Sequence, residues 1–189
     1  LDGDNMIVTL EAGAGVWWTF RLVRSKATFS GNWKLAGEGA AAVGPNIGSA
    51  EWWSSTAANG AGPAERSCLF DDVFHFGADG SFQNFMDGAT WVEGWQGGSD
   101  ACEVPVSPHD GASAGSFTYQ DVDGSSHLVI SGRGSHLGLA KAVNGQELAS
   151  TGETPDSVDY LVTTLDGTSL TVSIESGAGV WWTFQLAKE

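Results

Sequence analysis

The sequence has 189 residues, of which 23 are acidic and 8 are basic, so its formal net charge is −15. Nucleic acids and anionic membranes bind basic surfaces, and this charge therefore disfavours both as partners. Hydrophobic residues make up 41% of the chain and nine residues are Trp, which excludes a disordered protein. No apolar run is long enough to span a membrane, so direct insertion is not expected. The 27 Gly residues predict many tight turns.

The two ends of the chain carry the same segment. Residues 1–25 and 165–189 are identical at 14 of 25 positions, including the unbroken block Gly13–Phe20 against Gly177–Phe184. This match predicts a tandem array with a period of about 164 residues. Residues 1–25 would then be the last two strands of a preceding repeat, and residues 26–189 one complete β-barrel repeat. Two similar hairpins within one fold are the alternative. An orphan hairpin would dangle or pair with a sheet edge of this chain or another.

Alternating apolar and polar residues predict short strands along the rest of the chain. The strand at 168–175 places Leu170, Val172 and Ile174 on one face. Further strands are predicted, in chain order, at 72–77, 80–86, 90–95, 116–121, 125–131 and 158–164. Asp-Gly pairs between several of these strands are typical of hairpin turns. The predicted fold class is all-β, an antiparallel β-barrel or a sandwich with long Gly-rich loops.

Two long loops, at 36–67 and 94–115, separate these strands, and the first is expected to hold one short helix around Ala50–Thr56. Cys68 and Cys102, the only two cysteines, adjoin these loops. A disulfide between them would pin both loops, whereas two buried free thiols are the alternative. A disulfide implies an oxidising compartment. Tandem arrays are also common in large surface proteins, and we therefore expect an extracellular or cell-surface location.

The segment Gly31-Asn32-Trp33-Lys34-Leu35 resembles the opening Gly-x-Trp strand of lipocalin-like barrels, including the lipocalin-like domains of secreted Bacteroidota proteins. Other motifs resemble uncharacterised repeat domains of marine Bacteroidota surface proteins, some of which adjoin family 16 glycoside hydrolase modules. These motifs are Val43-Gly44-Pro45, Trp52-Trp53-Ser54, Cys68-Leu69-Phe70-Asp71-Asp72, Asp79-Gly80-Ser81-Phe82 and Pro108-His109-Asp110-Gly111. The likeness covers most of residues 28–189. It implies a lipocalin-like barrel with Trp33 plugging one end, and it identifies a module rather than a chemistry.

Tryptophans in or beside the two loops are the candidate ligand-binding residues. Indole rings stack on the C–H faces of sugars, while carboxylates and amides pair with sugar hydroxyls. We expect Trp53 and Trp91 in the core and Trp52 and Trp95 at the surface. Trp181 faces away from the apolar side of its strand, where it would bind glycan or pack against the next repeat. The predicted ligand-binding set is Trp52, Trp95, Glu51, Glu93, Gln96 and Trp181.

The sequence offers no catalytic residues. Carboxylates crowd its central region, but it lacks the Glu-x-Asp-x-x-Glu strand of family 16 hydrolases, and its four His have no convincing Ser or Cys partner in the sequence. One structural calcium is a candidate, because Asp71-Asp72, Asp79-Gly80 and Asp121-Val122-Asp123-Gly124 place hard oxygen ligands in turns. Metal-free Asp-Gly turns explain the same pattern. No other cofactor is expected.

These observations predict a non-catalytic extracellular tandem-repeat module that binds polysaccharide through loop aromatics. The alternative is a structural repeat of a surface adhesin, stalk or filament, with neighbouring repeats as partners and the N-terminal hairpin acting in assembly. A glycoside hydrolase is a third possibility.

Overall fold

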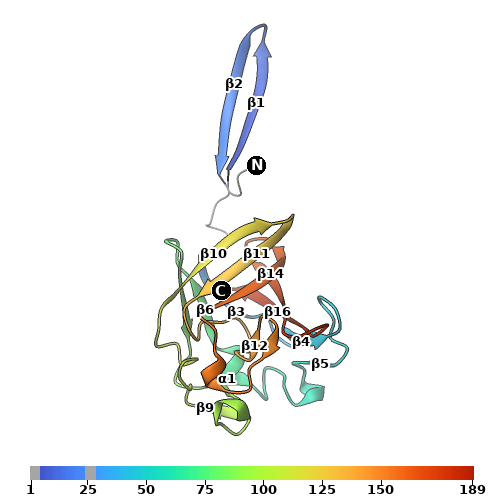
Figure 1. Ribbon diagram of the computed structural model, residues 1–189, viewed down its shortest axis with the longest axis vertical. Coiled ribbons are helices and arrows are strands. Elements are labelled where there is room, and N and C mark those ends of the chain that lie inside the picture. Colours follow the sequence, from blue (N-terminus) through green and yellow to red (C-terminus); the bar gives the residue numbers. More distant parts are fainter. Residues whose placement is uncertain (1–4, 24–28) are drawn as a thin grey trace.

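A closed eight-stranded antiparallel barrel forms the body of the protein (Figure 1). The computed structural model describes residues 5–23 and 29–189, and 47% of the chain is strand against 7% helix. The strands of the barrel are β3 (Gly31–Leu35), β6 (Val73–Phe76), β7 (Ser81–Phe85), β10 (Gly115–Val122), β11 (Ser125–Ser131), β14 (Ser157–Leu165), β15 (Ser169–Glu175) and β16 (Trp181–Lys188). They follow one another around the barrel in chain order, and β16 closes the ring by pairing with both β15 and β3. The fold is therefore the predicted barrel and not a sandwich.

Tight turns and side-chain alternation set the register of the barrel strands. Asp123 and Gly124 both adopt positive φ between β10 and β11, as the two central residues of a type I′ hairpin turn do. In β6, Phe74 and Phe76 are buried while their neighbours are partly exposed. A strand with this period-two pattern places one set of side chains inside the barrel and the other outside.

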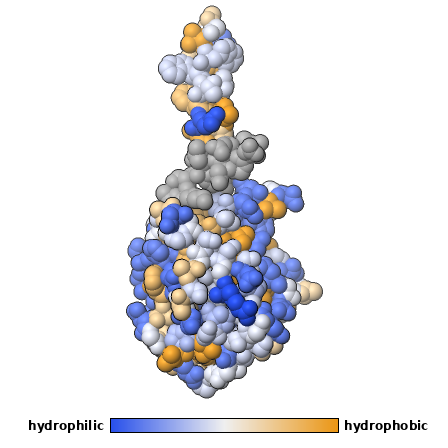
Figure 2. Space-filling view, turned by 60° about the vertical axis from the view of Figure 1, so that its left-hand side comes forward, coloured by the Kyte–Doolittle hydropathy of each residue, from blue (hydrophilic) through white to orange (hydrophobic). Residues whose placement is uncertain are grey.

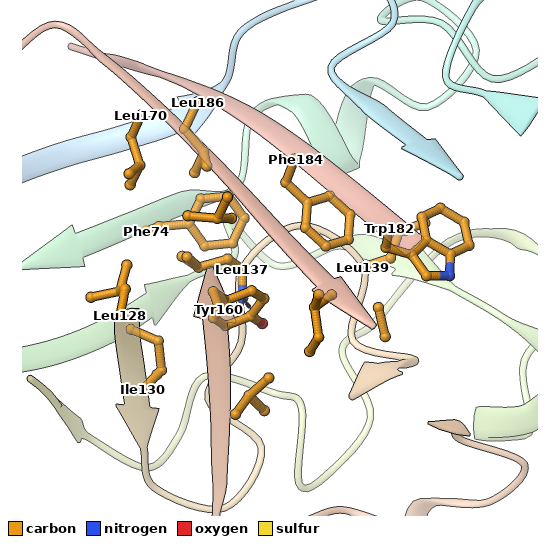
Figure 3. Packing of buried hydrophobic residues seen from close by; sticks show 14 of the residues in the cluster. Phe74, Leu128, Ile130, Leu137, Leu139, Tyr160, Leu170, Trp182, Phe184 and Leu186 are labelled. Atoms are coloured by element: carbon orange, nitrogen blue, oxygen red, sulfur yellow. Dashed lines mark hydrogen bonds between the residues drawn. The ribbon is translucent and has the colours of Figure 1, made fainter. Parts of the chain in front are cut away.

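Aromatic and aliphatic side chains fill the interior of the barrel (Figure 3). Trp33, Phe74, Tyr160 and Phe184 are each at most 1% exposed, and Tyr160 accepts a hydrogen bond from the backbone N–H of Leu137 at 2.9 Å. An eight-stranded barrel is just wide enough for side chains to fill it. The interior is therefore a packed core.

Short elements cover one end of the barrel. They are β4 (Ala41–Gly44), β5 (Trp53–Ser54), α1 (Ser67–Phe70), β8 (Thr90–Val92), β9 (Ala101–Glu103), β12 (Ala142–Val143) and β13 (Gln146–Glu147), with 3₁₀ turns η2 (Ala57–Asn59), η3 (Gly94–Gln96) and η4 (Thr151–Glu153). Strand β4 pairs with the first half of β16, and β5 pairs with β4. Within the described residues, no helix is long and apolar enough to cross a bilayer.

Two local predictions in this region are wrong. The segment around Ala50–Thr56 is not helical, because Trp53 and Ser54 pair as a strand with Val43 and Ala42. The strand predicted at 90–95 ends at Val92. Glu93 and Gln96 then form a reciprocal capping box that turns the chain into η3, and this local hydrogen bonding outweighs the strand pattern.

Cys68 and Cys102 form a disulfide, as one of the two sequence alternatives predicted, with 5.8 Å between their Cα atoms. It joins α1 to β9, so it ties together the two segments that the sequence analysis treated as long loops. The disulfide therefore holds the elements that cover the barrel end.

The N-terminal segment forms a separate hairpin of β1 (Asn5–Gly13) and β2 (Val16–Val23). Figures 1 and 2 both show it projecting from the barrel. Its apolar side chains are exposed on both faces, with Trp17 61% and Trp18 58% exposed. The predicted boundary between residues 25 and 26 lies outside the described residues.

Removing the disulfide should lower the free energy of unfolding without opening the barrel. The bridge spans 34 residues, and the chain-entropy model gives such a loop about 3–4 kcal/mol. We expect Cys68→Ala/Cys102→Ala to lose about this amount in urea denaturation. Reduction of the wild type should give the same shift, and an unchanged midpoint after reduction would contradict the prediction.

Candidate functional site

A pocket of about 290 Å³ opens at the end of the barrel that the short elements cover. Its aliphatic lining comes from Val43 and Leu139. Its aromatic and charged lining is contributed by Trp53, Trp182, Arg66, Lys141, Glu93 and Glu147. These residues come from β4, β5, β13, β16 and the segments beside α1, η3 and β12. The pocket therefore exists only when the covering elements and the last barrel strand are in place together.

Two indole rings form the aromatic part of the pocket. Trp53 and Trp182 meet edge to face, with ring centroids 5.7 Å apart and an interplanar angle of 60°. Trp182 lies at the edge of the core cluster, as Figure 3 shows, and continues the aromatic stack of Phe184 at 6.0 Å. The rings are therefore supported by the core from behind, and such support fixes their orientation.

Arg66 lies against two aromatic rings. Its guanidinium carbon is 3.9 Å from the centroid of Trp91 and 5.3 Å from that of Trp53. Within the described residues, Arg66 has no carboxylate at ion-pair distance, and its Nε is buried without a hydrogen-bond partner. Burial lowers the pKa of Arg66, but guanidinium remains charged at any physiological pH. The pocket thus carries a cation that no carboxylate of the described residues contacts.

The other charged groups of the pocket are paired. Lys141 Nζ lies 3.1 Å from Glu93 Oε1 and 5.0 Å from the ring centroid of Trp182. Trp182 donates its indole N–H to Glu147 Oε1 at 2.6 Å. These contacts hold the indole from both sides, and they leave one carboxylate oxygen, Glu147 Oε2, without a partner among the described residues.

The structure brings only part of the predicted ligand-binding set together. Trp95 donates to Glu93 Oε2 at 3.0 Å, and the Glu93 backbone N–H donates to Gln96 Oε1 at 3.0 Å. Of these three residues, Glu93 lines the pocket, while Trp95 is partly buried against the core. Glu51 and Trp52 are exposed in the segment before β5, outside the pocket lining, and Trp52 is 53% exposed. Trp181 is partly exposed next to Trp182, and strand alternation directs it to the opposite face.

Sequence reasoning missed most of the pocket. Trp53 was expected in the core, and alternation puts Trp182 on the apolar face of its strand; both residues pack in or against the core while also lining the pocket. Arg66, Lys141 and Glu147 lie far apart in the sequence and carry no motif. Only the topology, which places the segments beside α1, β12 and β13 around the start of β16, brings them together.

Two histidines are buried beside the pocket region and are neutral at physiological pH. Burial lowers the pKa of His109 to about 3 and also lowers the pKa of His136. The His109 Nε2 lies 3.3 Å from the Thr154 hydroxyl, and the His136 Nδ1 lies 2.8 Å from the carbonyl oxygen of Gly134. The His136 ring is thus fixed to the backbone, whereas His109 Nδ1 is buried without a hydrogen-bond partner among the described residues.

Two of the residues proposed as calcium ligands, Asp79 and Asp72, make other contacts. Asp79 Oδ1 accepts from both the N–H and the hydroxyl of Ser81, and Asp72 accepts a 2.5 Å hydrogen bond from Thr90. Burial raises the pKa of Asp72 to about 8, and a protonated carboxyl group is a poor ligand for a cation. In the described part of the chain, no three His, Cys, Asp or Glu side chains are grouped as a metal site would require.

The geometry defines a class of protein by architecture alone: an up-and-down barrel with a packed interior and an aromatic, charged pocket at one mouth. No protein-family model matches the chain, and no curated protein matches it.

Asp72 should make the stability of the barrel depend on pH. Its pKa is raised from 3.8 to about 8 in the folded protein, so its contribution to stability is full below pH 3.8 and is lost as pH rises toward 8. Relative to the wild type, Asp72→Asn should therefore gain unfolding free energy as pH rises across this range, by about 2–5 kcal/mol in total. Urea denaturation at a series of pH values measures the difference.

The neighbouring exposed Asp71 supplies the control for this prediction. The stability difference between Asp71→Asn and the wild type should follow only a small part of this pH course, because burial, and not the charge of Asp71, is the main cause of the raised pKa of Asp72. A constant difference between Asp72→Asn and the wild type from pH 4 to pH 8 would show that the carboxyl of Asp72 titrates normally.

Proposed function

We propose that this chain is a non-catalytic, extracellular repeat module that binds polysaccharide in the mouth pocket. The observation that carries the proposal is the pairing of two core-supported indoles, Trp53 and Trp182, with charged groups around a cavity of about 290 Å³. Indole faces stack on sugar rings, and the second carboxylate oxygen of Glu147 accepts a hydrogen bond from a hydroxyl group. The size suits one sugar residue of a chain rather than an extended segment.

The Arg66 guanidinium favours an acidic sugar residue in the pocket, whose other charged groups, Lys141, Glu93 and Glu147, make contacts of their own. Arg66 offers a planar guanidinium that no carboxylate of the described residues contacts, and such a group binds a ligand carboxylate in a bidentate manner. The net charge of −15 repels polyanions at long range. At the ionic strength of seawater or body fluids, that repulsion is screened beyond about 8 Å. The contact with Arg66 therefore determines whether an acidic polymer binds. A uronic acid polymer is the ligand class that this arrangement fits.

The disulfide supports the extracellular assignment, because such bridges persist in oxidising compartments. The resemblance to repeat domains of marine Bacteroidota surface proteins, carried by motifs such as Asp79-Gly80-Ser81-Phe82, agrees with a polysaccharide-rich setting. A structural repeat of a surface protein is the second candidate function. The duplicated terminal hairpin favours it, and the two functions are compatible in one array.

The binding proposal is tested by affinity electrophoresis in gels that contain alginate or a neutral β-glucan. Trp53→Ala should abolish the retardation of the protein by alginate, because it removes one wall of the pocket. Arg66→Gln should reduce the apparent affinity for alginate about tenfold or more, the value of one charge-assisted contact. Trp52→Ala is the matched control, since it removes an exposed indole next to Trp53 but outside the pocket lining.

Two results would contradict the pocket as the binding site. Loss of retardation with Trp52→Ala or Trp95→Ala, but not with Trp53→Ala or Arg66→Gln, would place the ligand on the loop aromatics outside the pocket. Absence of retardation of the folded wild type in every gel would leave the structural repeat as the function. Circular dichroism on each variant separates lost binding from lost folding.

A further inference from the structure

The floor of the mouth pocket belongs to the barrel core. Three of its lining residues, Val43, Leu139 and Trp182, are at most 8% exposed and are members of the buried cluster. Figure 3 shows Leu139 and Trp182 at one end of that cluster. Because protein interiors are close-packed, the core blocks the way from the pocket into the barrel. The pocket is therefore closed at its inner end.

The sides of the pocket are held by contacts between its own residues. Trp53 meets Trp182 edge to face at 5.7 Å, and the Arg66 guanidinium lies over the Trp53 ring at 5.3 Å. Lys141 and Glu93 form an ion pair at 3.1 Å, with side chains that are only 22% and 14% exposed. Walls that are fixed in this way are preorganised, so a ligand has to fit the volume of about 290 Å³ as it stands.

Two charged residues mark the depth of the pocket. Glu147 is exposed, so it lies at the mouth. Arg66 is only partly exposed, its Nε is buried, and its guanidinium lies against the ring of Trp91 at 3.9 Å. Glu93 and Asp100 are near enough to raise the pKa of Arg66, but neither is at ion-pair distance from it among the described residues. A ligand carboxylate that binds Arg66 therefore lies toward the inner end.

The linkage of a uronic acid polymer determines which of its residues a closed pocket can hold. In a 1,4-linked chain, each internal residue is bonded through C1 at one end of its ring and through O4 at the opposite end. Both neighbours of an internal residue would have to leave through the same mouth, and a pocket sized for one ring has no room for them. A terminal residue has only one neighbour. The pocket therefore selects a chain end.

The position of the carboxyl group determines which end enters. This group is attached to C5, next to C4, and C4 lies across the ring from C1. In the non-reducing terminal residue C4 is free, and the chain continues from C1. With the carboxylate on Arg66, C4 points inward and C1 points toward the mouth. The chain of a reducing terminal residue would instead leave from O4, toward the core.

We propose that the mouth pocket binds the non-reducing terminal residue of a 1,4-linked uronic acid chain, an inference that rests on the proposed function. Arg66 holds the carboxylate at the inner end by charge-assisted hydrogen bonds, and the chain leaves past Glu147. The protein thus recognises the ends of chains and not their length. Cutting a polymer multiplies its ends, so fragments released by depolymerisation are the preferred ligands.

The test compares alginate with its own fragments by isothermal titration calorimetry on the full chain. Mild acid hydrolysis gives saturated fragments of several lengths. One protein should bind per chain at each length, with Kd values that agree within about twofold. The binding capacity per gram of alginate should therefore rise in proportion to the number of chains.

Chemical changes at each end of the fragments make the test specific. Borohydride reduction alters only the reducing end and should leave the Kd of the longer fragments unchanged. Cleavage by an alginate lyase leaves a flattened, unsaturated residue without its 4-hydroxyl group at the non-reducing end, which should weaken binding at least tenfold. Arg66→Gln should weaken binding of saturated fragments about tenfold or more. Trp52→Ala, outside the pocket lining, is the matched control and should bind as the wild type does.

The outcomes distinguish failure of this proposal from failure of the proposed function. A number of bound proteins that grows with chain length, and that falls to zero in Trp53→Ala, would overturn end recognition while leaving the pocket as a polysaccharide site. Weaker binding after borohydride reduction, with no effect of the lyase-cut end, would also overturn it, because the reducing end would then occupy the pocket. Absence of binding to polymer and fragments alike by the folded wild type would overturn both proposals.

Discussion

The structure depends on the closure of the barrel by its last strand. Strand β16 pairs along its second half with β3, the first strand of the barrel, and along its first half with β4. The same strand pairs with β15 from Trp181 to Ala187. A sheet that closes on itself has no free edges and encloses one core. Without β16, the barrel edge, the core and one wall of the mouth pocket would all be lost together, so closure links stability to the site.

The duplicated hairpin separates what the local sequence determines from what packing determines. Both copies have the same pairing, the same turn contact to a glutamate and the same Trp-on-Phe stack. Their burial is opposite, because only one copy has the rest of a barrel around it. The identical block Gly13–Phe20 corresponds to the part of β16 that pairs with β4 and carries Trp182 to the pocket. The segment with the highest sequence identity between the two hairpins is therefore the one that both closes the barrel and lines the pocket.

Much of the barrel could be predicted from the sequence, because its strands obey rules that act over a few residues. Alternation located β6, β7, β10, β11, β14 and β15, and Asp123-Gly124 marked a hairpin turn. The elements at the mouth could not be found in this way. Strand β5 exists only because β4 lies beside it, and η3 replaces a strand because Glu93 and Gln96 cap each other. The pocket residues Arg66, Lys141 and Glu147 are brought together only by the topology. Trp52, in contrast, was expected at the surface from the sequence and is exposed.

Hydrogen–deuterium exchange of the wild-type chain at low concentration tests most directly the claim that closure, and not local sequence, gives the last hairpin its stability. Peptides that cover Gly13–Phe20 and Gly177–Phe184 have the same core sequence and are distinguished by their flanking residues. The amides of β16 should exchange only with unfolding of the whole barrel, and those of β2 should exchange at nearly the rate of an unprotected chain. Equal protection of the two segments would contradict the account, because it would mean that the hairpin is stable without a barrel or is packed in one at this concentration.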